Sequence, residues 1–105
     1  MIHELKCERR FFTKVSKGKK TFEIRKNDRN FQVGDYLALN ETDREDGEDY
    51  YTGNSLVARV GYILDDEKYV PEGYVAMSIT PAKISCGNES LFTQRANLRP
   101  IRREK

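Results

Sequence analysis

The chain has 105 residues, of which 37% are hydrophobic and 34% charged, with a formal net charge of +2. This length fits one domain and excludes a second core of comparable size. The charge is uneven, because ten Lys or Arg oppose four Asp or Glu in residues 1–31, three oppose eleven in 32–81, and six oppose two in 82–105. Basic ends around an acidic middle favour a face that attracts a polyanion, although a solvated surface without a partner would carry the same pattern.

The cysteines and the histidine give no sign of a metal site. Cys7 and Cys86 lie far apart in the sequence, and neither has the partner spacing of a zinc site. His3, the only histidine, is expected to be a packed or exposed side chain and not a ligand. The first residues carry charges and lack the apolar region of a secretory signal, and no apolar run approaches the ~20 residues that span a bilayer. We therefore expect a cytoplasmic protein with reduced cysteines, without a membrane, metal or cofactor.

The first predicted elements are a strand at residues 2–6 and a helix at residues 8–17. Apolar residues recur on one side of the predicted helix at helical spacing. Gly18 follows at the position where a helix ends in the left-handed conformation. We therefore predict a positive φ at Gly18, which turns the chain directly into the next strand.

That next strand is predicted at residues 21–26 from its strict alternation. Phe22 and Ile24 alternate with Glu23 and Arg25, so the apolar and the charged side chains lie on opposite faces of the strand. The apolar pair is expected to face the core.

Three further strands are predicted at residues 36–40, 55–64 and 74–80. The acidic stretch between the first two contains Asp46 and Gly47, a dipeptide typical of a hairpin turn. Alternation along these strands and the preceding one predicts a core that contains Phe22, Ile24, Leu37, Leu39, Val60, Tyr62, Val75 and Met77.

The order of strand, helix and then four strands predicts the fold class. Strands joined by hairpins and a single helix indicate an α+β, mainly β protein, with an antiparallel or mixed curled sheet of five or six strands. The helix should cover one end or side of this sheet. Repeated βαβ units are lacking, which argues against a doubly wound nucleotide fold. Residues 1–81 form the predicted domain, and residues 82–105 form a basic extension that is either packed on it or flexible.

A motif stands at the junction of the helix and the second strand. The run from Gly18 to Arg25 reads Gly-Lys-Lys-Thr-Phe-Glu-Ile-Arg and matches the Gly-x-Lys-x-x-Glu-x-Arg pattern of ASCH domains. With the flanking segments 27–31, 33–35 and 73–79, the chain resembles a small bacterial and phage subfamily of ASCH domains over about residues 2–80. The resemblance implies a PUA-like pseudo-barrel of five or six strands, with the motif lining a cleft for RNA or a modified nucleobase.

The residue types of the motif suit this role on physical grounds. Glu23 and Arg25 share one face of a strand, where Arg25 can offer its planar fork to a phosphate or a base edge. Glu23 either holds that arginine in place or accepts a hydrogen bond from a base amino group. Lys20 can reach over the same cleft from the turn. The predicted RNA- or base-binding residues are Lys19, Lys20, Thr21, Glu23, Arg25, Lys26 and Arg29.

Two points about this site stay open at the level of sequence. Glu23 and Arg25 could form a surface ion pair, which contributes less than ~1 kcal/mol, without binding anything. Single-stranded RNA is also bound by stacking, for which Tyr36, Tyr51 or Tyr74 could supply a ring.

Two other functions compete with RNA or base binding. One ASCH branch of similar size hydrolyses the amide of an acetylated cytidine with the motif Lys, a Thr on the motif strand and a Glu from an inserted segment. Lys20 fits that pattern, but Glu23 stands at the Thr position, and neither Glu67 nor Glu72 aligns with the missing acid. No catalytic residue is therefore assigned, and Lys20 and Glu23 are the candidates if the protein is an enzyme. The third function is a protein-binding adaptor that uses the acidic hairpin at residues 43–49.

Overall fold

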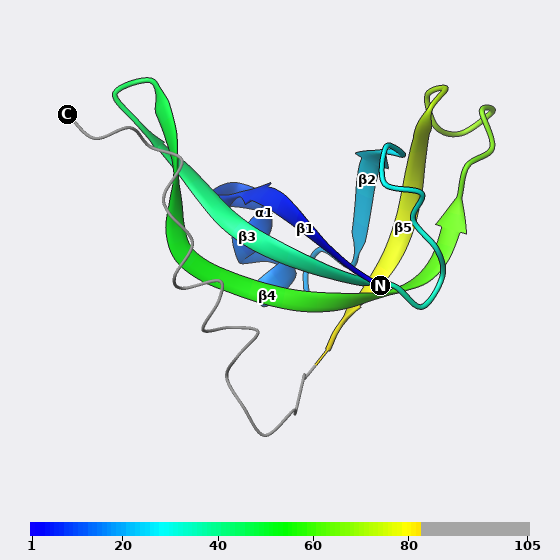
Figure 1. Cartoon of the computed structure of the whole chain (residues 1–105), viewed down its shortest axis with the longest axis horizontal. Helices are drawn as coiled ribbons and strands as arrows, with labels where there is room; N and C mark the ends of the chain where they lie inside the picture. Colours follow the sequence, from blue (N-terminus) through cyan, green and yellow to red (C-terminus); the bar gives the residue numbers. More distant parts are fainter. Residues whose placement is uncertain (83–105) are drawn as a thin grey trace.

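The computed structural model describes residues 1–82, so the predicted basic extension lies outside it apart from its first residue. The element order is β1 (Ile2–Glu8), α1 (Arg9–Ser16), β2 (Phe22–Lys26), β3 (Tyr36–Glu45), β4 (Glu48–Leu64) and β5 (Tyr74–Pro81) (Figure 1). The predicted mainly-β α+β fold, with five strands and one helix between the first two, is confirmed. Within residues 1–82, no helix is long and apolar enough to cross a membrane.

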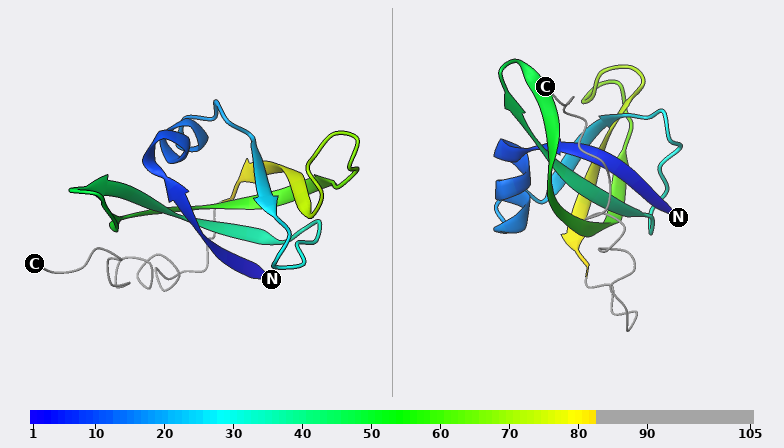
Figure 2. Two further views of the ribbon diagram at one scale, coloured as in Figure 1. Left: turned by 90° about the horizontal axis from the view of Figure 1, so that it is seen from above. Right: turned by 60° about the vertical axis from the view of Figure 1, so that its left-hand side comes forward.

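The five strands form one mixed sheet in the order β1-β3-β4-β5-β2. β1 runs parallel to β3, and the other neighbours are antiparallel. The sheet curls, with α1 on its concave side between β1 and β2 (Figures 1 and 2). β1 and β2 are its two edges and are not paired with each other, so the sheet stays open and is not closed into a barrel.

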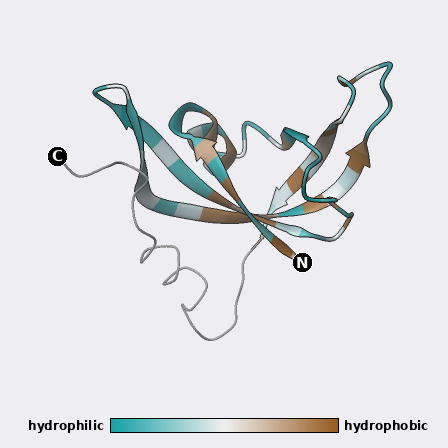
Figure 3. Ribbon diagram, turned by 45° about the horizontal axis from the view of Figure 1, so that its top comes forward, coloured by the Kyte–Doolittle hydropathy of each residue, from teal (hydrophilic) through white to brown (hydrophobic). Residues whose placement is uncertain are grey.

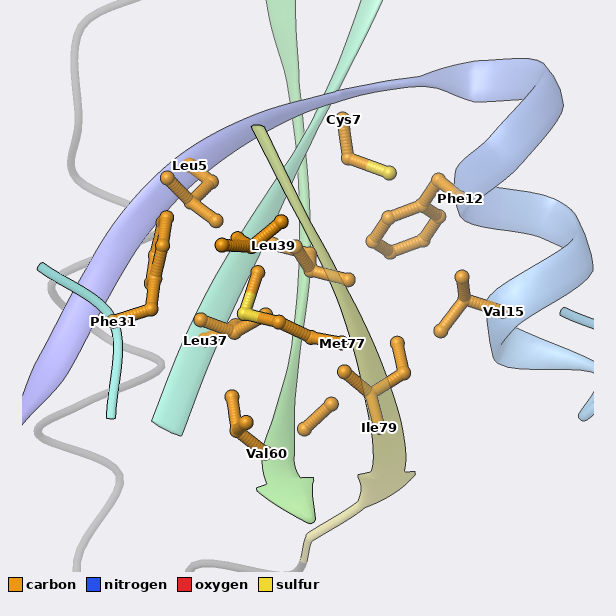
Figure 4. Close-up of a cluster of buried hydrophobic side chains, with 12 residues drawn as sticks. Leu5, Cys7, Phe12, Val15, Phe31, Leu37, Leu39, Val60, Met77 and Ile79 are labelled. Atoms are coloured by element: carbon orange, nitrogen blue, oxygen red, sulfur yellow. The ribbon is translucent and has the colours of Figure 1, made fainter. Parts of the chain in front are cut away.

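The core lies on the concave face of the sheet, under α1. Figure 4 shows Phe12 and Val15 of the helix pointing toward side chains from β5 and β3. The largest side chains with less than 2% exposure are Leu37, Leu39, Met77, Val15, Val60 and Val75. Five of the eight predicted core residues are therefore confirmed, namely Leu37, Leu39, Val60, Val75 and Met77.

The prediction for β2 was wrong about which face is buried. Phe22 and Ile24 are 49% and 52% exposed, whereas Glu23 is 3% exposed. The register explains this, because Glu23 is opposite Met77 of β5, whose side chain is in the core. Glu23 therefore lies on the core side of β2, and Phe22 and Ile24 are its exposed side chains.

Tyr62 also differs from its predicted place in the core, since it is 64% exposed. The pairing of β4 with β5 shifts register between Val60 and Tyr62. A shift of one residue moves a side chain to the other face of a strand. Val60 therefore packs inward while Tyr62, two residues later, points outward opposite Ser78.

The acidic stretch between the third and fourth strands is itself a paired hairpin. β3 and β4 continue to Glu45 and Glu48, with Asp46 and Gly47 as a two-residue turn in which both φ angles are positive, at 53° and 80°. This confirms the predicted turn and is the conformation of a type I′ hairpin. Figure 3 shows that this end of the hairpin is hydrophilic.

Gly18 ends α1 as predicted, with a φ of +74°. Its N–H donates to the carbonyl of Val15 at 3.0 Å, and the N–H of Lys19 donates to the carbonyl of Lys14 at 2.8 Å. These two bonds form a Schellman motif, which requires the left-handed conformation at the glycine. The motif directs the chain from the helix into Lys20 and β2.

Gly18→Val should lower the free energy of unfolding by about 2 kcal/mol, because a β-branched residue is strained at this φ. Apart from the adjoining residues, no atom of residues 1–82 lies within 4 Å of an added Cβ, so the backbone and not a clash would cause the loss. Gly18→Asn is the control, since asparagine tolerates the left-handed region. Urea unfolding of both variants checks this, and equal stability of the two would contradict it.

The start of β1 is held by a buried carboxylate at the start of β3. Asp35 Oδ2 lies 2.8 Å from His3 Nε2 and accepts from the N–H of Gln32 at 3.0 Å, while Oδ1 lies 3.4 Å from the N-terminal ammonium of Met1. His3 packs edge-on against Phe31 with ring centroids 4.8 Å apart. His3 is thus a packed side chain. Burial alone would raise the pKa of Asp35, but these hydrogen bonds outweigh burial and lower the pKa below its ordinary value.

This lowered pKa predicts a loss of stability in acid. The unfolded chain binds the proton more readily than the folded chain, so the contribution of Asp35 is complete above the unfolded pKa of about 3.9. It is lost as the pH falls through the lower folded pKa. Asp35→Asn should be less stable than the parent at pH 7, and the difference should shrink below about pH 4. Urea unfolding at pH 7 and in acid checks this, and a constant difference would contradict it.

Candidate functional site

A pocket of about 530 Å³ lies at the gap between the two edge strands of the sheet. The end of β1, the first turn of α1, the turn before β2 and β2 itself contribute most of its lining. The β3–β4 hairpin borders it. The lining residues are Lys6, Cys7, Glu8, Phe11, Lys20, Phe22, Glu23, Ile24, Arg25, Thr42 and Asp49.

Lys20, Glu23 and Arg25 of the motif meet in this pocket. The Glu23 carboxylate is only 5% exposed and accepts from both cations, with Oε1 bound by Lys20 Nζ and Oε2 bound by Arg25 Nε at 2.8 Å. Each cation thus binds a different oxygen of the carboxylate. Glu23 therefore holds both cations in fixed positions, and the three groups together carry a net charge of +1.

The Lys20 side chain lies close to two aromatic rings. Its Nζ lies 5.5 Å from the centroid of Phe11 and 4.9 Å from that of Phe22, and it donates to the carbonyl of Phe22 at 2.7 Å. Cation–π contact adds to the attraction of Glu23. The ammonium is therefore fixed at the wall of the pocket, with its side chain 15% exposed.

Arg25 joins the two edges of the sheet. Its Nη2 donates to the carbonyl of Lys6 on β1 at 2.7 Å, while its Nε binds Glu23 on its own strand. Arg29 makes a second link, since its Nη1 donates to the carbonyl of Glu4 at 3.0 Å. The strands β1 and β2 are not paired through their backbones, and these two arginine side chains, from β2 and the loop that follows it, connect to β1 instead.

The other predicted binding residues do not reach the pocket. Lys19, Thr21 and Lys26 are exposed, and none of them lines it. Arg29 is engaged at β1, outside the lining. The tyrosines considered for stacking, Tyr36, Tyr51 and Tyr74, are also not part of the lining.

Only three of the eleven lining residues were predicted from the sequence. The other eight were not, and Cys7 and Phe11 are two of them. Phe11 of α1 is 38% exposed and lines the pocket. Burial, followed by the charge of Glu23, raises the pKa of the Cys7 thiol to about 11. Cys7 is therefore a neutral thiol and a weak hydrogen-bond donor at physiological pH.

A second depression of about 430 Å³ continues from the pocket along the hairpin and shares Glu8, Thr42 and Asp49 with it. Its charges are paired, with Arg9 bound to Asp43 at 2.8 Å and Arg44 bound to Asp49 at 2.9 Å. In the described part of the chain, no group of three or more His, Cys, Asp or Glu side chains is arranged to hold a metal ion.

Comparison with known proteins gives two results. The chain is 37% identical over 96 residues to the "Uncharacterized 12.9 kDa protein in GpA 3'region" of Escherichia phage P2, covering 87% of this chain and 84% of that protein. Residues 2–79 match the family described as "Domain of unknown function (DUF3850)", and this span includes every residue that lines the pocket. The chain therefore belongs to the DUF3850 family.

Proposed function

We propose that this protein is a cytoplasmic module that binds RNA or a modified nucleobase in the pocket of Lys20, Glu23 and Arg25. The observation that carries the proposal is the convergence of these three motif residues on one pocket. The proposal includes the finer fold assignment, in which the open sheet is a PUA-like pseudo-barrel of an ASCH domain. The motif at residues 18–25 supports that assignment.

The chemistry of the pocket supports a flat, polar ligand. Its volume lies within the roughly 300–1,000 Å³ that is usual for sites of small ligands. Phe11, Phe22 and Ile24 supply apolar surface for the face of a ring, and Lys20 and Arg25 supply charged donors for its edge or for a phosphate. Bases in single-stranded RNA have both the face and the edge free.

The hydrogen bonds of Lys20 favour binding over catalysis. A lysine that acts as nucleophile or base needs a free lone pair on its nitrogen. Lys20 Nζ donates to the carbonyl of Phe22 and to the carboxylate of Glu23, so it is placed as a donor. The hydrolytic alternative is therefore the second candidate and is tested alongside the first.

The test uses two ligands, a single-stranded RNA and acetylated cytidine, with one assay each. Fluorescence anisotropy at low salt should show binding of a labelled single-stranded RNA of mixed sequence, weakening as salt is added. Lys20→Ala should bind about tenfold more weakly, because a hydrogen bond to a charged group is lost. Lys68→Ala, which removes the same charge from an exposed loop, should bind like the parent.

The same protein is then incubated with acetylated cytidine. Turnover that disappears in Lys20→Ala would replace the binding proposal with the hydrolytic one. If RNA is not bound at low salt but a protein partner binds through the hairpin at residues 43–49, the adaptor function takes its place.

A further inference from the structure

The hydrogen bonds inside the pocket determine which groups remain for a ligand. Each Glu23 oxygen already accepts from a cation, and the side chain is 5% exposed. Glu23 is therefore a positioning residue that fixes two donors, and little of its surface is left for a ligand.

Lys20 and Arg25 each have at least one N–H group that makes no hydrogen bond to another described residue. Two of the three N–H groups of the Lys20 ammonium are donated, to Phe22 and Glu23. Arg25 has five N–H groups and donates one from Nε and one from Nη2. Its Nη1 end is left for a ligand. Both side chains line the same pocket, joined through one carboxylate.

The two carboxylates at the rim of the pocket are paired with arginines and are largely exposed to solvent. Glu8 lies 3.3 Å from Arg10, and Asp49 lies 2.9 Å from Arg44, and these two carboxylates are 65% and 54% exposed. Thr42, whose hydroxyl can donate or accept, and the weak S–H donor of Cys7 also line the pocket. Beside Lys20 and Arg25 the enclosed part offers N–H donors and apolar surface. A ligand group that presents a donor there would meet another donor, which costs the desolvation of an unpaired polar group.

On the basis of the proposed function, we propose that the pocket selects nucleobases with two adjacent acceptors on one edge. Guanine presents N7 and O6, the pair that Lys and Arg bind most often. Cytosine presents O2 and N3. Adenine places its amino group beside N7 and beside N1, and the two oxygens of uracil are separated by an N–H. Guanine and cytosine should therefore bind more tightly than adenine and uracil.

The experiment uses the full chain and labelled RNAs of nine nucleotides, four uridines on each side of one variable base. Anisotropy at low salt should give about tenfold tighter binding for guanine or cytosine than for adenine or uracil at the centre. Replacing the central guanine with 7-deazaguanine, which lacks N7, should remove most of that gain. Lys68→Ala should retain the full preference.

Arg25→Lys separates charge from edge recognition. It keeps the positive charge but not the fork, so its preference for guanine over adenine should fall to about twofold or less while binding of the all-uridine RNA is retained. Circular dichroism should show that the Arg25→Lys variant is folded. If it is not, the 7-deazaguanine comparison still tests edge selection, because it uses only the parent protein.

The outcomes distinguish this inference from the proposed function. If all the RNAs bind alike, or if adenine or uracil is preferred, edge selection is wrong, and weaker binding by Lys20→Ala would still support the module. Preference for uracil that is lost in Glu23→Gln would mean that Glu23 reads the N3–H of the base. If no RNA binds, both the module and the selection fail.

Discussion

Leu37→Ala should lower the free energy of unfolding by about 3 kcal/mol. Leu37 has 0% exposure near the start of β3, and its neighbours in the register are His3 of β1 and Ala58 of β4. The cavity would lie between three strands that cannot easily close over it, so both the lost burial and the cavity contribute. A domain of this size has on the order of 5–10 kcal/mol of stability, and the variant should therefore unfold at a much lower urea concentration.

Val33→Ala serves as the control for this prediction. Val33 is 62% exposed, so its truncation should change the free energy of unfolding by less than about 0.5 kcal/mol. Equal effects of the two substitutions in urea unfolding would mean that the concave face of the sheet is not the core.

Glu23→Ala should cost about 2–3 kcal/mol of stability, although it removes a charged group. Its loss would leave Lys20 and Arg25 side by side, without their shared acceptor, in a pocket where their side chains are 15% and 25% exposed. Removing one partner from a fully buried ion pair costs about 3–5 kcal/mol, and the water that still reaches both cations reduces that value.

The measurement is urea unfolding of Glu23→Ala beside Glu67→Ala, which removes a carboxylate from an exposed loop. The Glu67 variant should match the parent. Added salt should narrow the gap between the Glu23 variant and the parent, because salt screens the repulsion between the cations. An unchanged stability of Glu23→Ala would show that the carboxylate does not organise the pocket.

Local signals in the sequence were sufficient for most of the fold. Gly18 after an apolar stripe predicted the end of α1, and Asp46-Gly47 predicted the turn of the hairpin, because each depends on a backbone conformation that few residues adopt. The parallel pairing joins β1 to β3, which are separated along the chain by α1 and β2, so no local signal specifies it. From the sequence, the sheet could have been either antiparallel or mixed.

The reversed face of β2 shows where alternation is insufficient. A period of two separates Phe22 and Ile24 from Glu23 and Arg25, but it does not say which pair is inside. Apolar residues usually face the core, and that rule fails here because β2 is an edge strand whose concave side borders a charged pocket. At this edge the carboxylate of Glu23 is enclosed because it accepts from both Lys20 and Arg25.

The candidate site could be predicted only where its residues are close together in the sequence. Lys20, Glu23 and Arg25 belong to one short motif, so their spacing along the chain was enough to bring them together. Cys7 and Phe11 reach the pocket only because β1 and α1 lie across from β2 in the folded sheet. Lys19, Lys26 and Arg29 lie close by in sequence but point to solvent or to β1.

The most direct test of the central claim is to locate the RNA on the protein. Titration of the isotope-labelled chain with a nine-nucleotide single-stranded RNA, followed by two-dimensional NMR of the backbone amides, reports which residues sense the ligand. The account predicts shifts at residues 6–11 and 20–25, around the pocket, with the amides of the hairpin turn at residues 45–48 little changed. Shifts confined to that hairpin, or no shifts at low salt, would contradict it.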